Sequence, residues 1–512
     1  MVGRLHRLAQ GRATNKTFLE LEGAILEQCL QMGRWVMAEA LAAHALANPD
    51  QEYACPRCGG RLRILRPQGP REVRSRLGPI SYNRPYGTCD RCRRSGRPVS
   101  GAPMDWALGL PDEDISIGLQ KQVCDASMLA RSFADARKII EGHDMVDINA
   151  KRIRELAERE GRRLAQVRDR DAQSYEQHQL EIPPEQSPSL LVICADGGRV
   201  QTRTEFAERG ARERCGEPTG HAQHREIVSP QQQQRPKERW KESKVGVVYD
   251  AAAKPQPTAS KYGEYLGAGA KIKTYVATMQ PWDRFGWFLR VEAEKRGYVK
   301  AKTKLFLADG APHIRELQRL HFSDATFILD WPHAAEHLSA SAKAAFGEGT
   351  AEAEAWHVEH RQMLWDGKVD SLIGEFGRLA RRAGDPRDND PEGSPRKVLH
   401  RNAYSYFPNN KDAIAYPDYR ANGWPIGSGV VEAAVKQFGI RMKSSEKFWN
   451  LGWAAPDPDS PEFDPDQTGA EEMLALRALY LSEDGRWEKY WEERGQPKRW
   501  TQTLAPPNPP AQ

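Results

Sequence analysis

Two periodicities of apolar residues divide the chain into a helical front part and a central part of strands and helices. Between residues 16 and 48 apolar side chains recur about every 3.6 positions, which predicts one long helix. Residues 115–165 show the same rhythm with interruptions and predict several helices. Within them, 133–140 followed by a helix over 151–170 resembles a helix-turn-helix, although ordinary helix pairs share this pattern.

Short runs that are apolar on both faces predict buried strands in the central part. Leu190–Ala195 and Lys304–Ala308 are such runs, and each is followed by Asp and then Gly, which we expect to end the strand. Further candidate strands are 244–250, 273–278 and 326–330. Strands that alternate with helices favour a mixed α/β sheet.

Acidic residues stand at the predicted ends of these strands. Asp196 and Asp309 follow the first two runs, and a helix predicted further along the chain would carry Glu432 beside them. Two divalent cations held by three carboxylates are suited to phosphoryl transfer. Asp250 and Asp330 also stand at strand ends, and many such residues only cap turns or helices. The spacing alone therefore leaves the choice among these acids open.

The composition narrows the class of protein without deciding its function. A chain of 512 residues, of which 39% are apolar, can hold several domains and more than one core. Its mean hydropathy of -0.72 indicates a polar, soluble protein. No apolar run approaches the roughly 18 residues of a membrane span, and the first ten residues lack the apolar core of a secretory signal. We therefore expect a cytoplasmic protein.

Four of the eight cysteines form two Cys-x-x-Cys pairs, Cys55 with Cys58 and Cys89 with Cys92. Four thiolates at this spacing suit a tetrahedral structural zinc ion, and residues 62–86 between the pairs alternate like an antiparallel hairpin. The long stretch between the pairs leaves a redox-active pair as the alternative. The other cysteines are expected to be small buried hydrophobes: Cys29, Cys124, Cys194 and Cys215.

Arginine is concentrated around these cysteines. Residues 55–97 contain twelve arginines and no lysine, with Glu72 and Asp90 as the only acids, which is typical of a nucleic-acid-binding surface. The alternative is a solvated basic face without a ligand. Candidate DNA contacts are Arg57, Arg61, Arg63, Arg74 and Arg76 near the cysteines, Arg152, Arg159 and Arg163 in the 151–170 helix, and Arg441 and Lys443 beyond Glu432.

Six segments, taken in order along the chain, resemble one known family. They are 195–203, 244–248, 307–311, 328–338, 425–434 and 441–443. These segments are similar to the Kra-type insertion-sequence transposases, bacterial DDE transposases of the Mutator-like group, and the similarity covers most of the chain. The resemblance implies an RNase H-like core in which Asp196, Asp309 and Glu432 are the catalytic triad and bind Mg²⁺ or Mn²⁺.

The resemblance also implies a partner and a reaction. Such a transposase would bind double-stranded DNA at terminal inverted repeats, cut it, and join the freed end to target DNA, as a homodimer or higher oligomer near the bacterial nucleoid. Asp330 and His333 match the Mutator-group signature of Cys or Asp followed by His, interpreted as structural or DNA-positioning. The 122 residues between Asp309 and Glu432 imply an α-helical insertion in the core.

The fold class expected from these features is a multidomain α/β protein with an RNase H-like mixed-sheet core, an α-helical insertion, a zinc ribbon and a helical DNA-binding module. The expected domains are an N-terminal helical segment (1–50), the zinc ribbon (51–102), the helical, helix-turn-helix-like module (103–182), the first part of the core (189–345), the insertion (346–420), the second part of the core with C-terminal helices (421–500) and a disordered tail (501–512).

Two other functions stay open on the sequence. A DNA-binding regulator with an inactive transposase-derived domain would keep the cysteine pairs and the basic helices, although retention of all three acids argues against it. The segment His333–His337 also spells the H-x-x-E-H string of some zinc peptidases, in which two histidines bind zinc beside a Glu base. A peptidase would leave the arginine-rich front part unexplained.

Overall fold

The chain forms a multidomain α/β protein with a mixed sheet and many helices, as predicted. The computed structural model describes residues 17–46, 53–110, 113–144, 146–182, 187–202, 240–444, 447–450 and 469–497. Two compact units divide the chain, the first from 1–157 with 486–512 and the second from 158–485. The predicted tail at 501–512 and Cys215 lie outside the described residues. None of the described helices combines the length and apolar composition needed to cross a bilayer.

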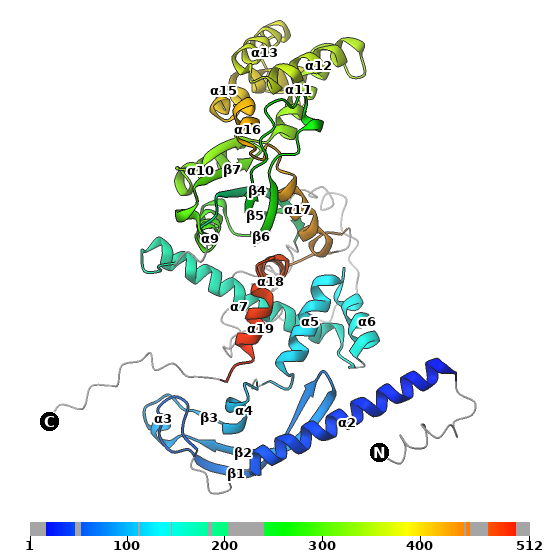
Figure 1. Cartoon of the computed structure of the whole chain (residues 1–512), viewed down its shortest axis with the longest axis vertical. Coiled ribbons are helices and arrows are strands. Elements are labelled where there is room, and N and C mark those ends of the chain that lie inside the picture. The colour runs from blue at the N-terminus through cyan, green and yellow to red at the C-terminus, as the bar shows by residue number, and fades with distance from the viewer. Residues whose placement is uncertain are drawn as a thin grey trace, which may run out of the picture. The chain divides into compact units, whose positions relative to one another are not determined.

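The first unit combines a small antiparallel sheet with helices. Its described elements are α2 (Phe18–Leu46), β1 (Arg63–Ser75), β2 (Gly78–Thr88), α3 (Asp90–Arg94), β3 (Ser100–Gly101), α4 (Pro103–Ala107), α5 (Ile117–Leu129), α6 (Phe133–Asp144), the start of α7 (Ala150–Glu176) and α19 (Arg486–Arg494) (Figure 1). The strands pair in the order β1-β2-β3. The helix predicted at 16–48, the hairpin at 62–86 and the helices after residue 115 are confirmed.

The second unit is built on a five-stranded mixed sheet. Its strands are β4 (Leu190–Gln201), β5 (Trp240–Ala252), β6 (Gly269–Thr278), β7 (Thr303–Ala308) and β8 (Thr326–Leu329), in the spatial order β6-β5-β4-β7-β8. The strands β4, β5 and β6 pair antiparallel, whereas β7 runs parallel to β4 and β8 parallel to β7. Parallel strands are buried on both faces and need continuous apolar runs, which explains why β4 and β7 were recognisable.

Helices cover both faces of this sheet. The covering helices are α9 (Trp282–Lys295), α10 (Pro312–His321), α17 (Gly429–Met442) and α18 (Ala470–Leu481). Helix α9 packs where Gly246 of β5 leaves room for Leu289, while α17 packs where Gly198 of β4 faces Val435. Figure 1 shows α9 and α10 on one side of the strands and α17 on the other.

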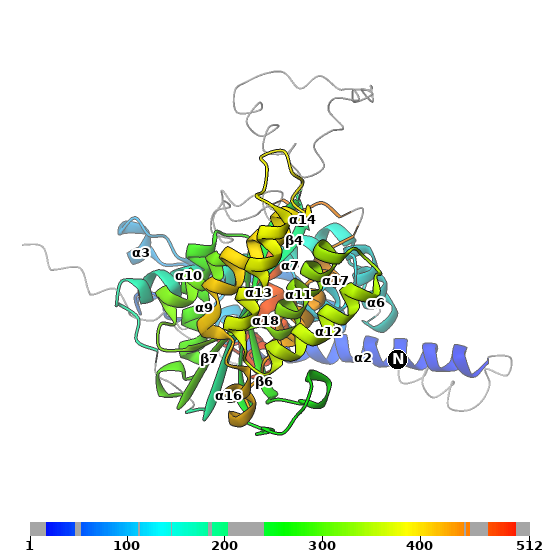
Figure 2. The same cartoon turned by 90° about the horizontal axis from the view of Figure 1, so that it is seen from above.

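Helices fill the segment between β8 and α17. They are α11 (Trp331–Phe346), α12 (Ala351–Trp365), α13 (Val369–Ala383), α14 (Pro395–Arg401), α15 (Phe407–Asn409) and α16 (Tyr416–Asn422), with a π-helical turn at Asn402–Tyr406. The helices α11, α12 and α13 lie side by side (Figure 2). Stacked rings of Phe376 and Phe407, 4.7 Å apart, tie α13 to α15.

The strand β4 departs from the prediction because it does not end at Asp196. Pairing with β5 continues through Gly197 and Gly198 to Gln201. At Gly197 and Gly198 a Cβ atom would lie 2.8 Å from side-chain oxygens of the neighbouring strand, so these glycines serve close packing and not a turn. Asp196 therefore lies within a strand, beyond the last residue of β4 that pairs with β7.

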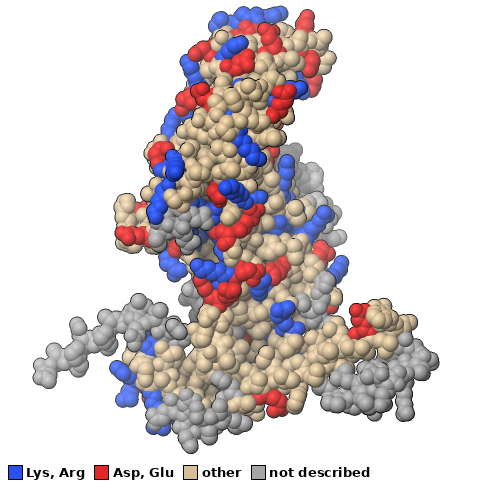
Figure 3. Space-filling view, in the orientation of Figure 1, with Lys and Arg blue, Asp and Glu red and all other residues tan. Residues whose placement is uncertain are grey.

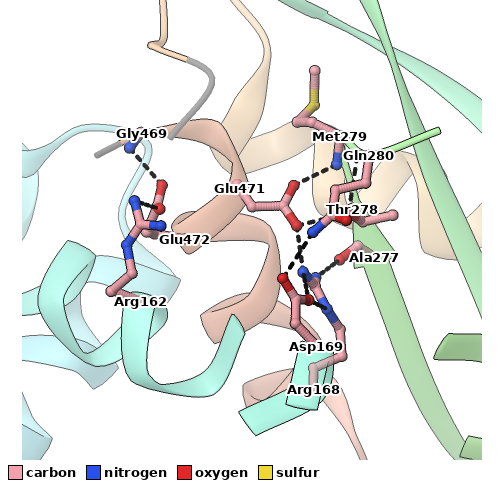
Figure 4. Close-up of polar contacts among 10 residues, drawn as sticks. All are labelled: Arg162, Arg168, Asp169, Ala277, Thr278, Met279, Gln280, Gly469, Glu471 and Glu472. Atoms are coloured by element: carbon pink, nitrogen blue, oxygen red, sulfur yellow. Dashed lines mark hydrogen bonds and ion pairs between the residues drawn. The ribbon is translucent and has the colours of Figure 1, made fainter. Parts of the chain in front are cut away.

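Buried carboxylates attach α18 to the sheet and to α7 (Figure 4). One oxygen of Glu471 accepts hydrogen bonds from Thr278 at 2.7 Å and from Arg168 at 2.5 Å, and the other accepts from the backbone N–H of Met279 at 2.6 Å. The next residue, Glu472, pairs with Arg162. The donors from Thr278 and Met279 are buried and Arg168 is partly buried, so Glu471 loses charge-assisted hydrogen bonds if it is neutralised, although Asp169 still pairs with Arg168 at 2.6 Å.

We expect Glu471→Gln to lower the free energy of unfolding by about 2 kcal/mol, because buried donors lose a charged acceptor while Asp169 still pairs with Arg168. Urea unfolding of the full chain measures this. Glu483→Gln is the matched control, since Glu483 pairs with Lys273 at 2.8 Å on the surface and should change stability by less than about 0.5 kcal/mol. Equal effects of the two substitutions would contradict the expectation.

A buried histidine at the end of α10 makes stability depend on pH. Burial lowers the pKa of His321 to about 4, and the charge of Arg290 adds to the effect, whereas an unperturbed histidine titrates near 6.5. The ring lies 4.7 Å from that of Trp287. Because the unfolded chain binds more protons between pH 6.5 and 4, the free energy of unfolding decreases as the pH falls through that window.

We expect His321→Phe to reduce this acid-induced loss by about 2 kcal/mol between pH 7 and pH 4.5, since phenylalanine keeps an aromatic ring and carries no titrating proton. Denaturant unfolding of wild type and variant at the two pH values gives the difference directly. Parallel losses in both proteins would show that His321 does not carry the pH dependence.

Candidate functional site

Three carboxylates converge at one edge of the mixed sheet in the second unit. The parallel register of β4 and β7 ends at Cys194 opposite Leu307, and Asp196 and Asp309 each stand two residues further on. Glu432 lies in the first turn of α17, the helix on β4. All three side chains are partly exposed. The backbone therefore brings together the acids that the sequence placed far apart.

The neighbouring acids affect the pKa of Asp196. Burial raises the pKa of Asp196, and the neighbouring charges of Asp309 and Glu432 raise it further. The N–H of Gly197, 2.6 Å from one carboxylate oxygen, opposes this increase. Carboxylates that repel one another at a partly exposed site are a suitable environment for divalent cations, which bind oxygen ligands and neutralise the charge.

Two other acids that the sequence could not separate from the triad have different surroundings. Asp250 pairs with Arg296 at 2.5 Å. Asp330 is fully buried; one of its oxygens accepts from the N–H of Ser428, and the other accepts from the N–H of His333 at 3.0 Å. Asp330 thereby joins the end of β8 to the start of α17, and the interpretation of Asp330 and His333 as structural or DNA-positioning stays a prediction.

His333 lies beside the triad, which the sequence did not reveal. Its Nδ1 is 2.5 Å from Asp330, and this hydrogen bond raises the pKa of His333 to about 9. Ligand atoms of Asp330, His333 and Glu432 lie within 4.8 Å of one another, so this group is a second possible arrangement for a metal ion. The N–H groups of Ser428 and His333 already donate to the oxygens of Asp330 and would compete with a metal ion for them. Of the three residues, Glu432 is therefore the most suitable metal ligand.

Two tyrosines next to the site were also missed. The Tyr406 hydroxyl, from the π-helical turn, donates to the backbone oxygen of Asp309 at 3.0 Å. The ring of Tyr262 stacks on Trp331 at 5.8 Å, and only a glycine at Gly427 leaves room for its hydroxyl. Both tyrosines are separated from the acids by long stretches of sequence, and no local pattern marks them. The π-turn itself is a feature often found at functional sites.

The first unit brings the four predicted cysteines together. Sulfur atoms of Cys55 and Cys92 are 3.8 Å apart, and those of Cys58 and Cys89 are 3.5 Å apart. This cluster is compatible with a structural zinc ion. Burial would raise the pKa of Cys89, but hydrogen bonds from the N–H of Cys92 and from the neighbouring thiols lower it to about 7. Such N–H donors stabilise the thiolate that a zinc ion requires.

The predicted DNA-contacting residues have unequal surroundings. Arg57, Arg61, Arg63, Arg74, Arg76 and Lys443 are exposed, whereas Arg152, Arg159 and Arg163 are partly buried. Figure 3 shows basic side chains gathered near α3. Arg441 departs from the prediction: it is 1% exposed and lies over the ring of Trp449, so its guanidinium is not available to a phosphate. The reason is that α17 turns this side chain into the unit.

Part of the positive charge near the cysteines is neutralised within the first unit. Asp105 of α4 accepts from Arg84 at 3.1 Å, pairs with Arg71, and accepts from the hydroxyl of Tyr82 at 3.1 Å. Arg63 pairs with Asp90 at 3.1 Å. The surface that DNA would meet is therefore less basic than the count of arginines suggests.

The histidines of the H-x-x-E-H string do not form a zinc site with Glu336. The Nδ1 of His337 lies 2.7 Å from Asn402, and its ring stacks on Tyr406 at 3.6 Å. His333 instead bonds Asp330. Within the described residues, the groups whose ligand atoms all lie within 4.8 Å of one another are the four cysteines and the set of Asp330, His333 and Glu432, whereas Asp196, Asp309 and Glu432 do not form such a group. The arrangement gives no support to a peptidase.

No protein-family model matches the chain, and a search of curated proteins finds no match. The resemblance to Kra-type transposases thus remains a prediction that rests on the motifs.

Proposed function

We propose that this protein is a DDE transposase of an insertion sequence, with an RNase H-like core that cuts DNA and joins the freed end to target DNA. The observation that carries the proposal is the convergence of Asp196, Asp309 and Glu432 from β4, the end of β7 and the first turn of α17. A five-stranded mixed sheet covered by helices on both faces supports it, because it holds acids from distant segments at one edge.

The three acids would hold two Mg²⁺ or Mn²⁺ ions, whose chemistry is to activate the attacking oxygen and stabilise the leaving oxygen. Asp196 is the acid whose pKa the charges of both Asp309 and Glu432 affect, and it would hold the ions together with them. Asp309 is held in place by the N–H of Ala311, which donates to its carboxylate at 2.9 Å. Glu432 is oriented by the hydroxyl of Ser428 at 3.2 Å.

The reaction consists of two phosphoryl transfers at one site. In the first, the oxygen of water bonds to the phosphorus at the element's end, the bond to the 3′ oxygen breaks, and a 3′-hydroxyl is released. In the second, that hydroxyl bonds to a target phosphorus and displaces the target's own 3′ oxygen. No covalent link to the protein is required, so the chain needs positioning groups and no nucleophilic side chain.

The first unit would hold the ends of the element. The exposed arginines around the cysteine cluster would contact phosphates, and helix α6 with the start of α7 would lie against the duplex. Binding that rests on phosphate contacts weakens steeply with salt. Joining two ends requires at least two copies of the chain on DNA.

The test is Mg²⁺-dependent cleavage and strand transfer on labelled DNA that carries the gene's own flanking sequence. We expect wild type to yield joined products and Glu432→Gln to yield none. The matched control is Glu352→Gln, which changes an exposed glutamate in the first turn of another helix, α12, and should keep full activity. DNA binding without cleavage by wild type, in both Mg²⁺ and Mn²⁺, would favour the regulator instead.

A further inference from the structure

A narrow stripe of apolar side chains runs along the exposed side of α2. Phe18, Ile25 and Met32 are spaced seven residues apart, and Cys29 and Val36 alternate with them at intervals of three and four. All five are exposed, from 41% for Met32 to 81% for Phe18. An average spacing of 3.5 residues is the pattern of the seam of a two-stranded coiled coil, and further exposed apolar side chains, Leu19, Leu26, Trp35 and Met37, flank this seam.

Helix α2 contacts its own unit through the opposite side. The guanidinium of Arg34 donates to the backbone oxygen of Leu77 at 2.8 Å. Ala38 and Leu41 pack against the core formed by the sheet and α4. These three positions lie roughly half a turn around the helix axis from Val36. The stripe is therefore turned away from the part of the first unit that the structure describes.

The exposed area matches what a partner would need to cover. Together with the flanking Leu19 and Trp35, 77% and 58% exposed, the stripe presents on the order of 800 Å², about what each partner contributes to a standard interface. Figure 3 shows few charged side chains over α2. The charged residues described on this helix are Glu20, Glu22, Glu27, Arg34 and Glu39, an excess of acids that disfavours DNA as the occupant.

We propose that α2 is a self-association helix, and that two copies of this chain pair through the stripe as a coiled coil without DNA. A partner must match a 3.5-residue repeat over about five turns, and a second copy of α2 carries the same repeat. Glu22 falls in the stripe between Phe18 and Ile25. A single polar residue at such a position fixes register at a cost in stability. The inference is independent of the proposed transposase activity.

Sedimentation of the full chain without DNA or Mg²⁺ tests the proposal. We expect wild type to be a dimer at micromolar concentration. Met32→Glu places a charge at the centre of the stripe and should weaken dimerisation by at least about 100-fold. Glu22→Leu removes the polar interruption and should tighten it by about tenfold. If Met32→Glu fails to fold, the tighter dimerisation expected for Glu22→Leu still tests the proposal.

The matched control is Leu320→Glu, which introduces the same charge at an exposed leucine of α10, 72% exposed. This variant should dimerise like wild type. The proposal is overturned if wild type stays monomeric up to roughly 50 µM, if folded Met32→Glu dimerises like wild type, or if Leu320→Glu dissociates as Met32→Glu does. If the protein forms the dimer but has no transposition activity, the proposed transposase function is contradicted and the proposed dimer is not.

Discussion

Asp196→Asn is expected to abolish DNA cleavage, with a loss of at least about 1000-fold, while leaving the fold intact. The substitution keeps the shape of the side chain and removes the charge that would bind cations between Asp309 and Glu432. The pKa of Asp196 is raised by burial and by those two acids, so its ionised form costs folding stability at neutral pH when no cation is present. The melting temperature of the variant should therefore equal or exceed that of wild type.

Cation binding gives a second measurement that does not depend on activity. Mg²⁺ or Mn²⁺ should raise the melting temperature of wild type, since a ligand of the folded state stabilises it, and should have much less effect on Asp196→Asn. Asp250→Asn is the control: Asp250 lies on β5 opposite Leu191, pairs with Arg296, and should lower stability while keeping the response to cations. A normal cation response in Asp196→Asn would remove this residue from the site.

The strands and the candidate acids could be predicted because both depend on local sequence. Continuous apolar runs belong to strands buried on both faces, so Leu190–Ala195 and Lys304–Ala308 were recognisable without knowledge of their neighbours. The end of β4 was placed wrongly because Asp followed by Gly usually marks a turn. Here Gly197 and Gly198 instead allow close pairing with β5, which only the tertiary structure decides.

Contacts between distant segments could not be predicted. The proximity of His333 and Glu432 depends on Asp330 joining β8 to α17, and Tyr406 reaches Asp309 from a π-turn in the insertion helices. No periodic pattern in the sequence indicates which distant residues come into contact. Arg441 was predicted to contact DNA by its distance along a helix, but the direction in which a helix turns its side chains depends on what packs around it.

Cys29 shows a further limit of sequence patterns. It was expected to be a small buried hydrophobe because it has no partner in a Cys-x-x-Cys pair, yet the structure exposes it. It also belongs to the apolar rhythm of residues 16–48. A 3.6-residue rhythm and a 3.5-residue repeat are hard to distinguish over one helix of 29 residues. The same apolar stripe can face the chain's own core or a second copy, and the sequence does not decide which.

Removal of zinc is expected to unfold residues 53–102 while the second unit stays folded. The apolar cores of this segment are small, since one consists of the four cysteines with Leu62, Val99 and Trp106 and the other of Val73, Ile80 and Tyr82 with Met104, and so few apolar contacts cannot balance the entropy of ordering the segment. Structural zinc binding contributes on the order of 10 kcal/mol in comparable small modules. Burial raises the pKa of Cys55 and Cys92, so without metal their thiols would be protonated and neutral.

The measurement is hydrogen exchange by mass spectrometry, with zinc content determined on the same protein. Wild type should hold one zinc ion per chain, and Cys89→Ser or a strong chelator should remove it and reduce protection of 53–102 by at least about 100-fold. Protection of β7 should not change. Cys124→Ser is the control, because Cys124 is a fully buried cysteine of α5 outside the cluster and should leave zinc bound. Full protection of 53–102 in zinc-free protein would mean that apolar packing and hydrogen bonds alone hold this segment together, which would contradict a structural role for zinc.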